Sequence, residues 1–435
     1  MSTISKIQSK GAIMKSDPIT DIKAIEILDN RGNPTIRSYV TIDNRFVGVA
    51  DVPSGSSTGS FEAKELRDGG KRYNGMGVKT AIGHIENIIK PALIGVHGAN
   101  QRNIDYKLNE LDGTDDKSKL GSNAILAVSL AVAKAAAKYC GLPLYRYLNA
   151  GAHVLPVPQA CLINGGLHAG NDLDIQEYCV MPVGADNFAH AVQMLSEIFK
   201  ELGEILLNSM GKNATNSSED GGFAPPLDSS FAAMEILQQA VKNCGYLDEV
   251  EFGLDLAASG LLSGDGKTYQ FEGKRRTARQ MIDYIKELVQ AFPKIVSIED
   301  PLDEKDYEGW IAITRELQDK MIIGDDIFAT NMDRIKMGIE KKIANSILCK
   351  VNQIGTLTET LEAIQMATRA GYTSVVSHRS GETEDTTIAD IAVAANAGQI
   401  KTGSASRTDR LAKYNQLLRI SEELGDSALY PGWDA

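Results

Sequence analysis

The sequence predicts an α/β protein in which a barrel of eight strands follows a smaller α+β domain. Three observations lead to this fold class. Strand-like runs precede helical ones in the first part of the chain, which is typical of a segregated α+β domain. Two apolar runs and two long helices follow, and then six short buried-strand runs alternate with helical patterns. The resulting order, ββαα(βα)6, supplies enough strands to close a barrel.

The first part of the chain contains the smaller domain and the segment before it. Residues 1–15 include three lysines but no apolar run, so we interpret residues 1–18 as a mobile tail rather than a secretory signal. Beyond it, β-branched runs bounded by turn residues predict strands, and apolar residues at helical spacing predict helices. We expect an α+β capping domain over residues 19–150, with strands at 19–28, 35–42 and 45–50 and helices at 78–94, 103–111 and 122–140.

Residues 151–435 contain the predicted barrel. Its first two strands, at residues 157–163 and 175–182, are joined by a Gly-rich loop with no room for a crossover helix. Parallel strands need such a crossover, so we expect an antiparallel hairpin here. The helices that we expect outside the barrel lie at residues 189–209, 229–243, 277–292, 356–370 and 410–424.

Each of the six later strand runs ends in a polar residue. These residues are Asp255, Glu299, Asp325, Lys350, His378 and Lys401. A single aspartate at a strand end is usually a turn or helix cap. Six polar residues separated by about one β/α unit each, with one longer gap, are different, because the C-terminal ends of barrel strands converge on one mouth. The pattern therefore predicts an active site.

The charges of these residues indicate the chemistry. Asp255, Glu299 and Asp325 offer hard oxygen ligands, which suit Mg²⁺ better than zinc or copper. Lys350 and Lys401 would face that metal, and we expect the neighbouring cation to lower their pKa values. A lysine base beside Mg²⁺ is a known arrangement for removing a proton next to a carboxylate.

Composition narrows the class of protein further. The net charge of −12 disfavours binding of nucleic acid, although a few focused cations can still bind a small anionic substrate. Five scattered cysteines without a C-x-x-C pair indicate a reducing cytoplasm rather than a disulfide framework or a zinc site. The most apolar helix, at residues 124–140, is short and carries two lysines, so we expect it to be buried rather than to span a membrane.

Long motifs surround these strand ends. They are Asn30-Arg-Gly-Asn-Pro-Thr, Pro53-Ser-Gly-Ser-Ser-Thr-Gly, Glu65-Leu-Arg-Asp-Gly, Ile163-Asn-Gly-Gly-Leu-His-Ala-Gly-Asn, Gln176-Glu, Ser297-Ile-Glu-Asp-Pro, Gly324-Asp-Asp, Lys350-Val-Asn-Gln-Ile-Gly-Thr, Ser377-His-Arg-Ser-Gly-Glu-Thr-Glu-Asp and Ile400-Lys-Thr-Gly. With them the chain resembles the enolase family, the phosphopyruvate hydratases of glycolysis, over about residues 22–424. The resemblance implies the enolase-like barrel with its N-terminal capping domain, a cytoplasmic lyase, and two Mg²⁺ ions per active site.

The resemblance also implies roles for the strand-end residues. Asp255, Glu299 and Asp325 would hold the first Mg²⁺, which the substrate carboxylate also coordinates. Lys350 would remove the proton at carbon 2 of 2-phosphoglycerate. Lys401 would pair with the carboxylate of the substrate and stabilise the intermediate.

Further roles follow for the loops around the mouth. Arg379 and Ser380 would grip the phosphate, the arginine through its bidentate fork. Ser57, in a Gly/Ser loop between a strand and a helix, would ligate the second Mg²⁺ as this lid closes. His168 lies in another Gly-rich loop and would be a second closing element that contacts the substrate. His378 joins the candidate catalytic residues through its place at a strand end.

The acid side of the site departs from the family pattern. Enolases carry Asp-Glu-Gly-Gly-Phe, whose glutamate acts with that of Gln-Glu to expel the C3 hydroxyl. Here Glu177 is present, but the motif reads Glu219-Asp220-Gly-Gly-Phe, so the shorter Asp220 stands in the glutamate position. Proton transfer needs heavy atoms within about 2.6–3.2 Å, so the lost methylene matters unless the loop or a water compensates.

Four other positions also differ from the usual enolase sequence. They are Arg37 in the second strand, Ser56 in the lid, Gly260 after the first metal aspartate, and Ser404 in the last loop. These changes leave two alternatives open. The chain could be an enolase-like dehydratase of a phosphonate analogue, similar to carboxyphosphonoenolpyruvate synthases, or a non-catalytic or moonlighting binding protein on the same scaffold. The resemblance implies a homo-oligomer, a dimer or an octamer, in either case.

Overall fold

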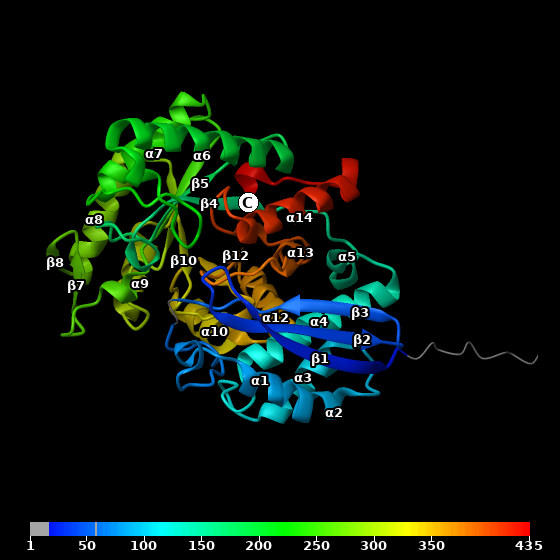
Figure 1. The fold of residues 1–435 in the computed structure, drawn as a ribbon. Helices are drawn as coiled ribbons and strands as arrows, with labels where there is room; N and C mark the ends of the chain where they lie inside the picture. Colours follow the sequence, from blue (N-terminus) through cyan, green and yellow to red (C-terminus); the bar gives the residue numbers. More distant parts are fainter. Residues whose placement is uncertain (1–16, 57–58) are drawn as a thin grey trace, which may run out of the picture.

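The computed structural model describes residues 17–56 and 59–435 (Figure 1). The predicted tail therefore lies outside the described residues except for its last two positions, and so does the predicted metal ligand Ser57. Asp17 is folded onto the small domain, because its carboxylate accepts a hydrogen bond from the backbone N–H of Ala99 at 2.6 Å and lies 2.8 Å from His97 Nδ1. The described fold thus begins two residues before the predicted start at residue 19.

The N-terminal part is a three-stranded antiparallel sheet covered by helices. Its order is β1-β2-β3, and the strands and helices lie close to the positions predicted from the sequence. The elements are β1 Ile19–Leu28, β2 Pro34–Ile42, β3 Phe46–Asp51, η1 Arg72–Gly75, α1 Lys79–His84, the π-helical turn η2 Ile85–Ile89, α2 Lys90–Leu93, α3 Gln101–Asp112, α4 Ser122–Cys140 and α5 Leu144–Leu148.

Helix α4 is the central core element of this part. Its alanine-rich surface lets it approach β3 closely: a Cβ added to Gly48 would lie 2.0 Å from the carbonyl oxygen of Ala131. By length and composition α4 could cross a membrane, but 78% of its apolar window is buried inside the structure. It is therefore the buried core helix that its sequence predicts.

The rest of the chain forms the barrel and the helices around it. The barrel strands are β4 Val157–Asn164, β5 Glu177–Met181, β6 Glu251–Asp255, β9 Ile295–Glu299, β10 Met321–Gly324, β11 Ser346–Cys349, β12 Thr373–Ser377 and β13 Gly398–Lys401. The helices are α6 Phe188–Met210, α7 Ser230–Asn243, α8 Ala278–Ala291, α9 Tyr307–Glu316, α10 Met332–Lys341, α11 Val351–Ile354, α12 Leu357–Arg369, α13 Thr387–Ala394 and α14 Thr408–Leu424. Short 3₁₀ turns are η3 Gly166–His168, η4 Lys212–Thr215, η5 Ala258–Leu261, η6 Gly425–Ser427 and η7 Gly432–Asp434.

The barrel closes in the order β10-β11-β12-β13-β4-β5-β6-β9. Strand β5 is antiparallel to both of its neighbours, which confirms the predicted hairpin, and the other pairs in the barrel are parallel. Because β5 is reversed, its first residue lies at the same mouth as the last residues of the other strands. A small hairpin that the sequence reading missed, β7 Thr268–Phe271 and β8 Lys274–Thr277, fills the longer gap between β6 and β9.

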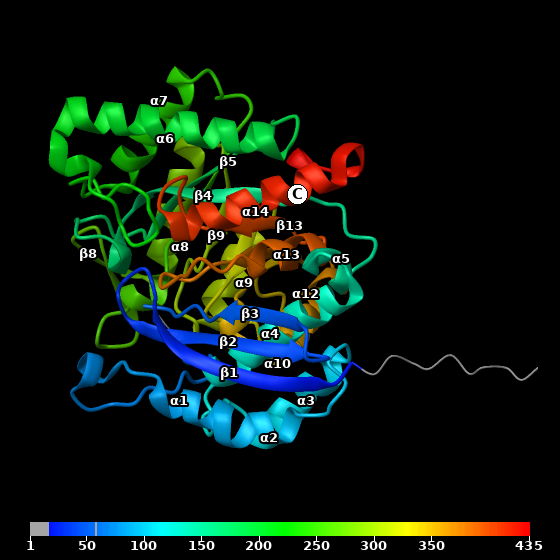
Figure 2. The same ribbon diagram turned by 45° about the vertical axis from the view of Figure 1, so that its right-hand side comes forward.

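Partly buried polar contacts join the small domain to the barrel. Figures 1 and 2 show this domain lying against one side of the barrel, where α4 contacts α11 and α12. The carboxylate of Asp385 accepts hydrogen bonds from Lys134 Nζ at 2.6 Å and from the backbone N–H of Asp51 at 3.0 Å. The loop after β3 is thereby held next to the barrel mouth.

Candidate active site

The six predicted strand-end residues converge on the barrel mouth. Asp255, Glu299 and Lys401 are the last residues of β6, β9 and β13, and Asp255 lies opposite Glu299 in the register. Asp325, Lys350 and His378 directly follow β10, β11 and β12. A polar cavity of about 20 Å³ lies at this mouth, and its lining includes Asp255, Lys350, His378 and Lys401 together with side chains from the neighbouring loops.

The lysines lie directly against the carboxylates. Lys401 Nζ donates to Asp255 Oδ2 at 2.9 Å and to Glu299 Oε2 at 2.7 Å, so these two oxygens lie within reach of one cation. Lys350 Nζ donates to Asp325 Oδ2, and Gln353 Nε2 donates to Asp325 Oδ1 at 2.7 Å. The carboxylates are thus oriented by partners on neighbouring strands and loops.

The donor set fits a hard divalent cation. The predicted ligands are buried carboxylates, and oxygen donors of this kind suit Mg²⁺ and similar ions. A fourth carboxylate, Asp300, was not among the predicted residues. Its two oxygens accept hydrogen bonds from the backbone N–H groups of Asp325 at 2.9 Å and Asp326 at 3.0 Å, so it holds the end of β10 in place. Asp300, Asp325 and Asp326 also bring carboxylate oxygens within 4.8 Å of one another.

The protein's own charges keep both lysines protonated. Burial is the largest influence and lowers the pKa of Lys350, but the nearby carboxylates, Asp325 foremost and Glu299 with it, raise the pKa above the usual value. Burial also opposes the charge of Lys401, whereas Asp255, Glu177 and Glu299 hold its pKa well above the usual value. The lowering expected from the sequence therefore requires the positive charge of a bound cation to offset these carboxylates.

The acid side is built from His168, Glu177 and Asp220. His168 Nδ1 lies 2.6 Å from Asp220 Oδ2, and Arg410 Nη2 lies 3.2 Å from Asp220 Oδ1. Burial opposes ionisation of Asp220, but His168 and Arg410 hold its pKa well below the usual range. Burial likewise opposes protonation of His168, yet Asp220 raises the pKa of the imidazole. These two groups form a buried ion pair.

Glu177 differs from Asp220 in its charge state. It is the first residue of the reversed strand β5, and its Oε2 lies 3.3 Å from Lys401 Nζ. Burial raises the pKa of Glu177, and the lowering by Lys401 does not overcome it because Asp220 and Asp255 add negative charge. Of the two carboxyl groups, Glu177 is therefore the one that more readily carries a proton.

The predicted phosphate-binding residues lie beside described residues of the loop after β3. Arg379 Nη1 donates to Glu62 Oε2 at 2.7 Å and to Asn352 Oδ1 at 3.0 Å, so this guanidinium contacts the loop after β3. Ser380 Oγ accepts a hydrogen bond from the backbone N–H of Ser56 at 2.7 Å. Both residues line the mouth cavity with the strand-end lysines.

Arg410, which is not among the residues predicted from the sequence, connects the loops of the site. This fully buried residue of α14 donates to the carbonyl oxygens of Arg379 at 2.6 Å, Ser380 at 2.7 Å and Glu219 at 3.0 Å. It also contacts His378 Nδ1, and burial together with Arg410 lowers the pKa of His378 well below the usual value. A positive charge in the first turn of a helix is disfavoured by the helix macrodipole. An arginine at the start of the predicted helix 410–424 therefore indicates that other contacts hold it there.

Two departures from the enolase pattern contact each other. Ser56 Oγ donates to Glu219 Oε2 at 2.8 Å and accepts from Arg31 Nη1 at 2.5 Å.

Gly260 lies by a larger cavity of about 720 Å³ next to the mouth, where an added Cβ would meet nothing within 4 Å. Arg37 forms a bidentate pair with Asp51 across β2 and β3, with both N–O distances at 2.6 Å.

The fold and the mouth together define a class. A closed β/α barrel with an α+β cap, in which lysines face several carboxylates, is typical of lyases that depend on a divalent metal ion.

Comparison with known proteins identifies the family. The family model "Enolase, N-terminal domain" matches residues 19–148, and "Enolase, C-terminal TIM barrel domain" matches residues 152–435. The chain is 55% identical to the enolase of Methanocaldococcus jannaschii over 408 residues, which cover 94% of this chain and 96% of that protein. It is 53% identical to the enolase of Thermococcus kodakarensis over 420 residues, with 95% and 97% covered. The chain belongs to the enolase family.

Proposed function

We propose that this chain catalyses the Mg²⁺-dependent dehydration of 2-phospho-D-glycerate to phosphoenolpyruvate. The observation that carries the proposal is the mouth of the barrel, where Lys350 and Lys401 face the carboxylates of Asp255, Glu299 and Asp325. The enolases that this chain matches support the same activity and do not favour the phosphonate analogue as substrate. Burying charged residues at the mouth costs free energy. Their presence there therefore argues against a binding protein without catalysis.

We assign the first half of the reaction to the lysines and the carboxylates that they contact. Asp255, Glu299 and Asp325 would hold Mg²⁺, which supplies positive charge for the substrate carboxylate as the α-proton leaves. Lys350, in its neutral form, removes the proton at carbon 2. Lys401 stays charged and pairs with the carboxylate of the substrate, because three buried carboxyl groups surround its ammonium.

We assign the second half, loss of the C3 hydroxyl, to Glu177 with the ion pair of His168 and Asp220. A proton donor must carry a proton before the bond breaks, and burial favours the protonated form of Glu177. Asp220 is held as an anion by His168 and Arg410, so its role is to position and charge the imidazole. The aspartate side chain is long enough for this role, since the oxygens of Asp220 reach both the His168 imidazole and the Arg410 guanidinium.

The remaining roles follow from the resemblance. Arg379 and Ser380 would bind the phosphate group, and His378, a neutral imidazole at the mouth, would contact the substrate. A second Mg²⁺ bound through Ser57 stays a prediction, because that residue lies outside the described part of the chain. We also propose a cytoplasmic homo-oligomer, a dimer or an octamer, which light scattering of the purified protein would measure.

The test is a direct absorbance assay for phosphoenolpyruvate formation from 2-phosphoglycerate. We expect turnover with Mg²⁺, loss of turnover with EDTA, and recovery when Mg²⁺ is restored. A well-folded protein without turnover under these conditions would contradict the proposal.

A double variant, Glu219→Asp with Asp220→Glu, tests the effect of the exchanged acids. We expect the swap to give no gain in kcat, because the space between His168 and Arg410 already fits the aspartate. A large gain would show instead that Asp220 limits the reaction through its reach. The single variant Glu219→Asp separates the effect of the Ser56 contact from that of the acid itself.

A further inference from the structure

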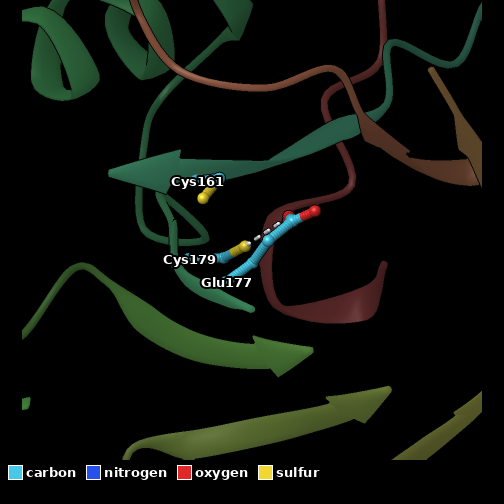
Figure 3. A group of neighbouring side chains, drawn as sticks. All are labelled: Cys161, Glu177 and Cys179. Carbon is cyan, nitrogen blue, oxygen red and sulfur yellow. Dashed lines mark hydrogen bonds between the residues drawn. The ribbon is translucent and has the colours of Figure 1, made fainter. Parts of the chain in front are cut away.

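Two cysteines meet inside the barrel directly beneath the acid side of the site. Cys161 of β4 and Cys179 of β5 are register partners in the antiparallel hairpin, so their side chains lie on the same face. Both are free and buried. Figure 3 shows the two cysteines beside Glu177, with Cys179 Sγ 3.8 Å from Glu177 Oε2, whereas Cys161 Sγ donates to the carbonyl oxygen of Ile163 at 3.3 Å.

From this juxtaposition we propose that Cys161, Cys179 and Glu177 form a binding site for a thiophilic divalent cation such as Zn²⁺ or Cd²⁺, separate from the Mg²⁺ carboxylates. One sulfur from each cysteine and one carboxylate oxygen all lie within 4.8 Å of one another. Two thiolates on one Zn²⁺, each at about 2.3 Å, lie about 3.8 Å apart, so small rotations of the side chains would bring them together.

The chemistry of the donors separates the two sites. Sulfur ligands select soft or borderline cations, whereas the carboxylates of Asp255, Glu299 and Asp325 select hard ones. Mg²⁺ therefore prefers the carboxylates to the cysteine pair. The two thiolates that form as protons leave Cys161 and Cys179 would neutralise one divalent cation, which offsets the repulsion from the Lys401 ammonium, 3.3 Å from Glu177.

Glu177 connects the cysteine pair to the outside. Its side chain lines the cavity at the mouth, along with His168 and Asp220, and it also contacts Cys179. A cation that enters by the mouth would meet the Glu177 carboxylate first and then the thiols. Once bound, the cation would coordinate the Glu177 carboxylate and prevent its protonation. If the proposed function of Glu177 is right, the cation inhibits the second half of the reaction.

The test follows Cd²⁺ by the ultraviolet absorption of its bonds to thiolate, in the Mg²⁺-loaded full chain. The parent protein for this test carries Cys140→Ser and Cys244→Ser, which remove the more accessible thiols. We expect one Cd²⁺ per chain with thiolate absorption in this parent. The added variant Cys161→Ser, Cys179→Ser, which keeps nearly the same shape, should lose that absorption.

Each result decides the proposal. A parent without thiolate absorption would overturn it, and so would a double variant that keeps the absorption, because Cys349 would then be the ligand. A third variant, Glu177→Gln, should keep the absorption but need a higher Cd²⁺ concentration to reach it. If the double variant fails to fold, the single variants Cys161→Ser and Cys179→Ser should each lose about half of the absorption, since each removes one of two thiolates.

The absorption does not depend on turnover, so failure of this site and failure of the proposed function give different results. With an active enzyme, low concentrations of Cd²⁺ should inhibit the parent more strongly than the double variant at saturating Mg²⁺. Equal inhibition of the two, relative to each variant's own rate, would show that Cd²⁺ acts by displacing Mg²⁺ from the carboxylates.

Discussion

Asp220 shows how a single side chain depends on partners that lie far away in the sequence. Its two oxygens lie near His168 of the β4–β5 loop and Arg410 of α14, and both contacts are buried. The sequence indicated that Asp220 is shorter than the usual glutamate. It could not indicate the ion pair, because the partners belong to segments that only the closed barrel brings together.

Lys350 is the residue whose replacement tests the first half of the reaction. We expect Lys350→Met to lower kcat by about 10²–10⁴-fold, the range for loss of a positioned base. Steady-state assays of 2-phosphoglycerate turnover would measure this. The control is Lys336→Met on the exposed face of α10, which should keep its rate. A rate near that of the unmodified protein in Lys350→Met would contradict the assignment.

Replacing Arg410 tests the contacts that join the loops of the site. Lys cannot reproduce the several hydrogen bonds of the guanidinium to the loops at residues 378–380 and 219–220. We expect Arg410→Lys to lower the free energy of unfolding by about 1–3 kcal/mol, because buried carbonyl oxygens lose their donors, and to lower kcat as well. Urea unfolding and turnover would be measured beside Arg315→Lys, an exposed position on α9 that should change neither.

The strands and helices were predictable where their patterns are local. Buried strand runs and amphipathic helices can be read from consecutive residues, and α4 has the same bounds as predicted. The hairpin of β7 and β8 was missed because each strand has only four residues and β8 has no buried side chain, which leaves little pattern to read. The candidate metal and base positions could be predicted from the strand ends for the same local reason, whereas the contacts that Arg410, Asp300 and Glu62 make depend on the fold.

The contact between β3 and α4 is sensitive to one methyl group. A Cβ at Gly48 would lie 2.0 Å from Ala131 O and 2.4 Å from Ala135 N, and both atoms belong to helix backbone that cannot rotate away. We expect Gly48→Ala to lower the free energy of unfolding by about 1–3 kcal/mol or more, measured by chemical unfolding.

The matched control for Gly48 is another glycine of the same domain. Gly83 lies within α1, where the nearest atom to an added Cβ is a flexible side-chain nitrogen at 3.9 Å. Gly83→Ala should therefore stabilise the helix by up to about 1 kcal/mol. Equal losses in both variants would show that the close approach of β3 and α4 is not the cause.

At the scale of the whole molecule, the active site depends on the attachment of the small domain to the barrel. Asp385 of the barrel loop accepts hydrogen bonds from Lys134 of α4 and from the backbone of Asp51. Burial opposes its charge, but Lys134 and nearby donors lower its pKa to about 2. This carboxylate therefore belongs to the junction that holds Ser56 and Glu62 of the loop after β3 beside Ser380 and Arg379.

The stability of the junction should depend on pH. The folded pKa of Asp385 lies below the ordinary aspartate value of about 3.9, so its contribution of roughly 2 kcal/mol is present above about pH 4 and is lost as the pH falls toward 2. We expect Asp385→Asn to be less stable than the unmodified protein at pH 6, with the difference shrinking below pH 4. Urea unfolding at several pH values measures it, and a difference that stays constant would contradict the linkage.

The reversed strand β5 has a consequence for insertions and deletions in this chain. Side chains alternate between the two faces of a strand, so Glu177 and Cys179 share the face that turns into the barrel, while Tyr178 lies among the outer core side chains. The loop at residues 165–176 enters β5 from the mouth, and a single-residue deletion there that slid the strand would exchange the two faces. Length changes in this loop should therefore be tolerated only where the loop absorbs them before Glu177, which makes its length a stricter requirement than most of its sequence.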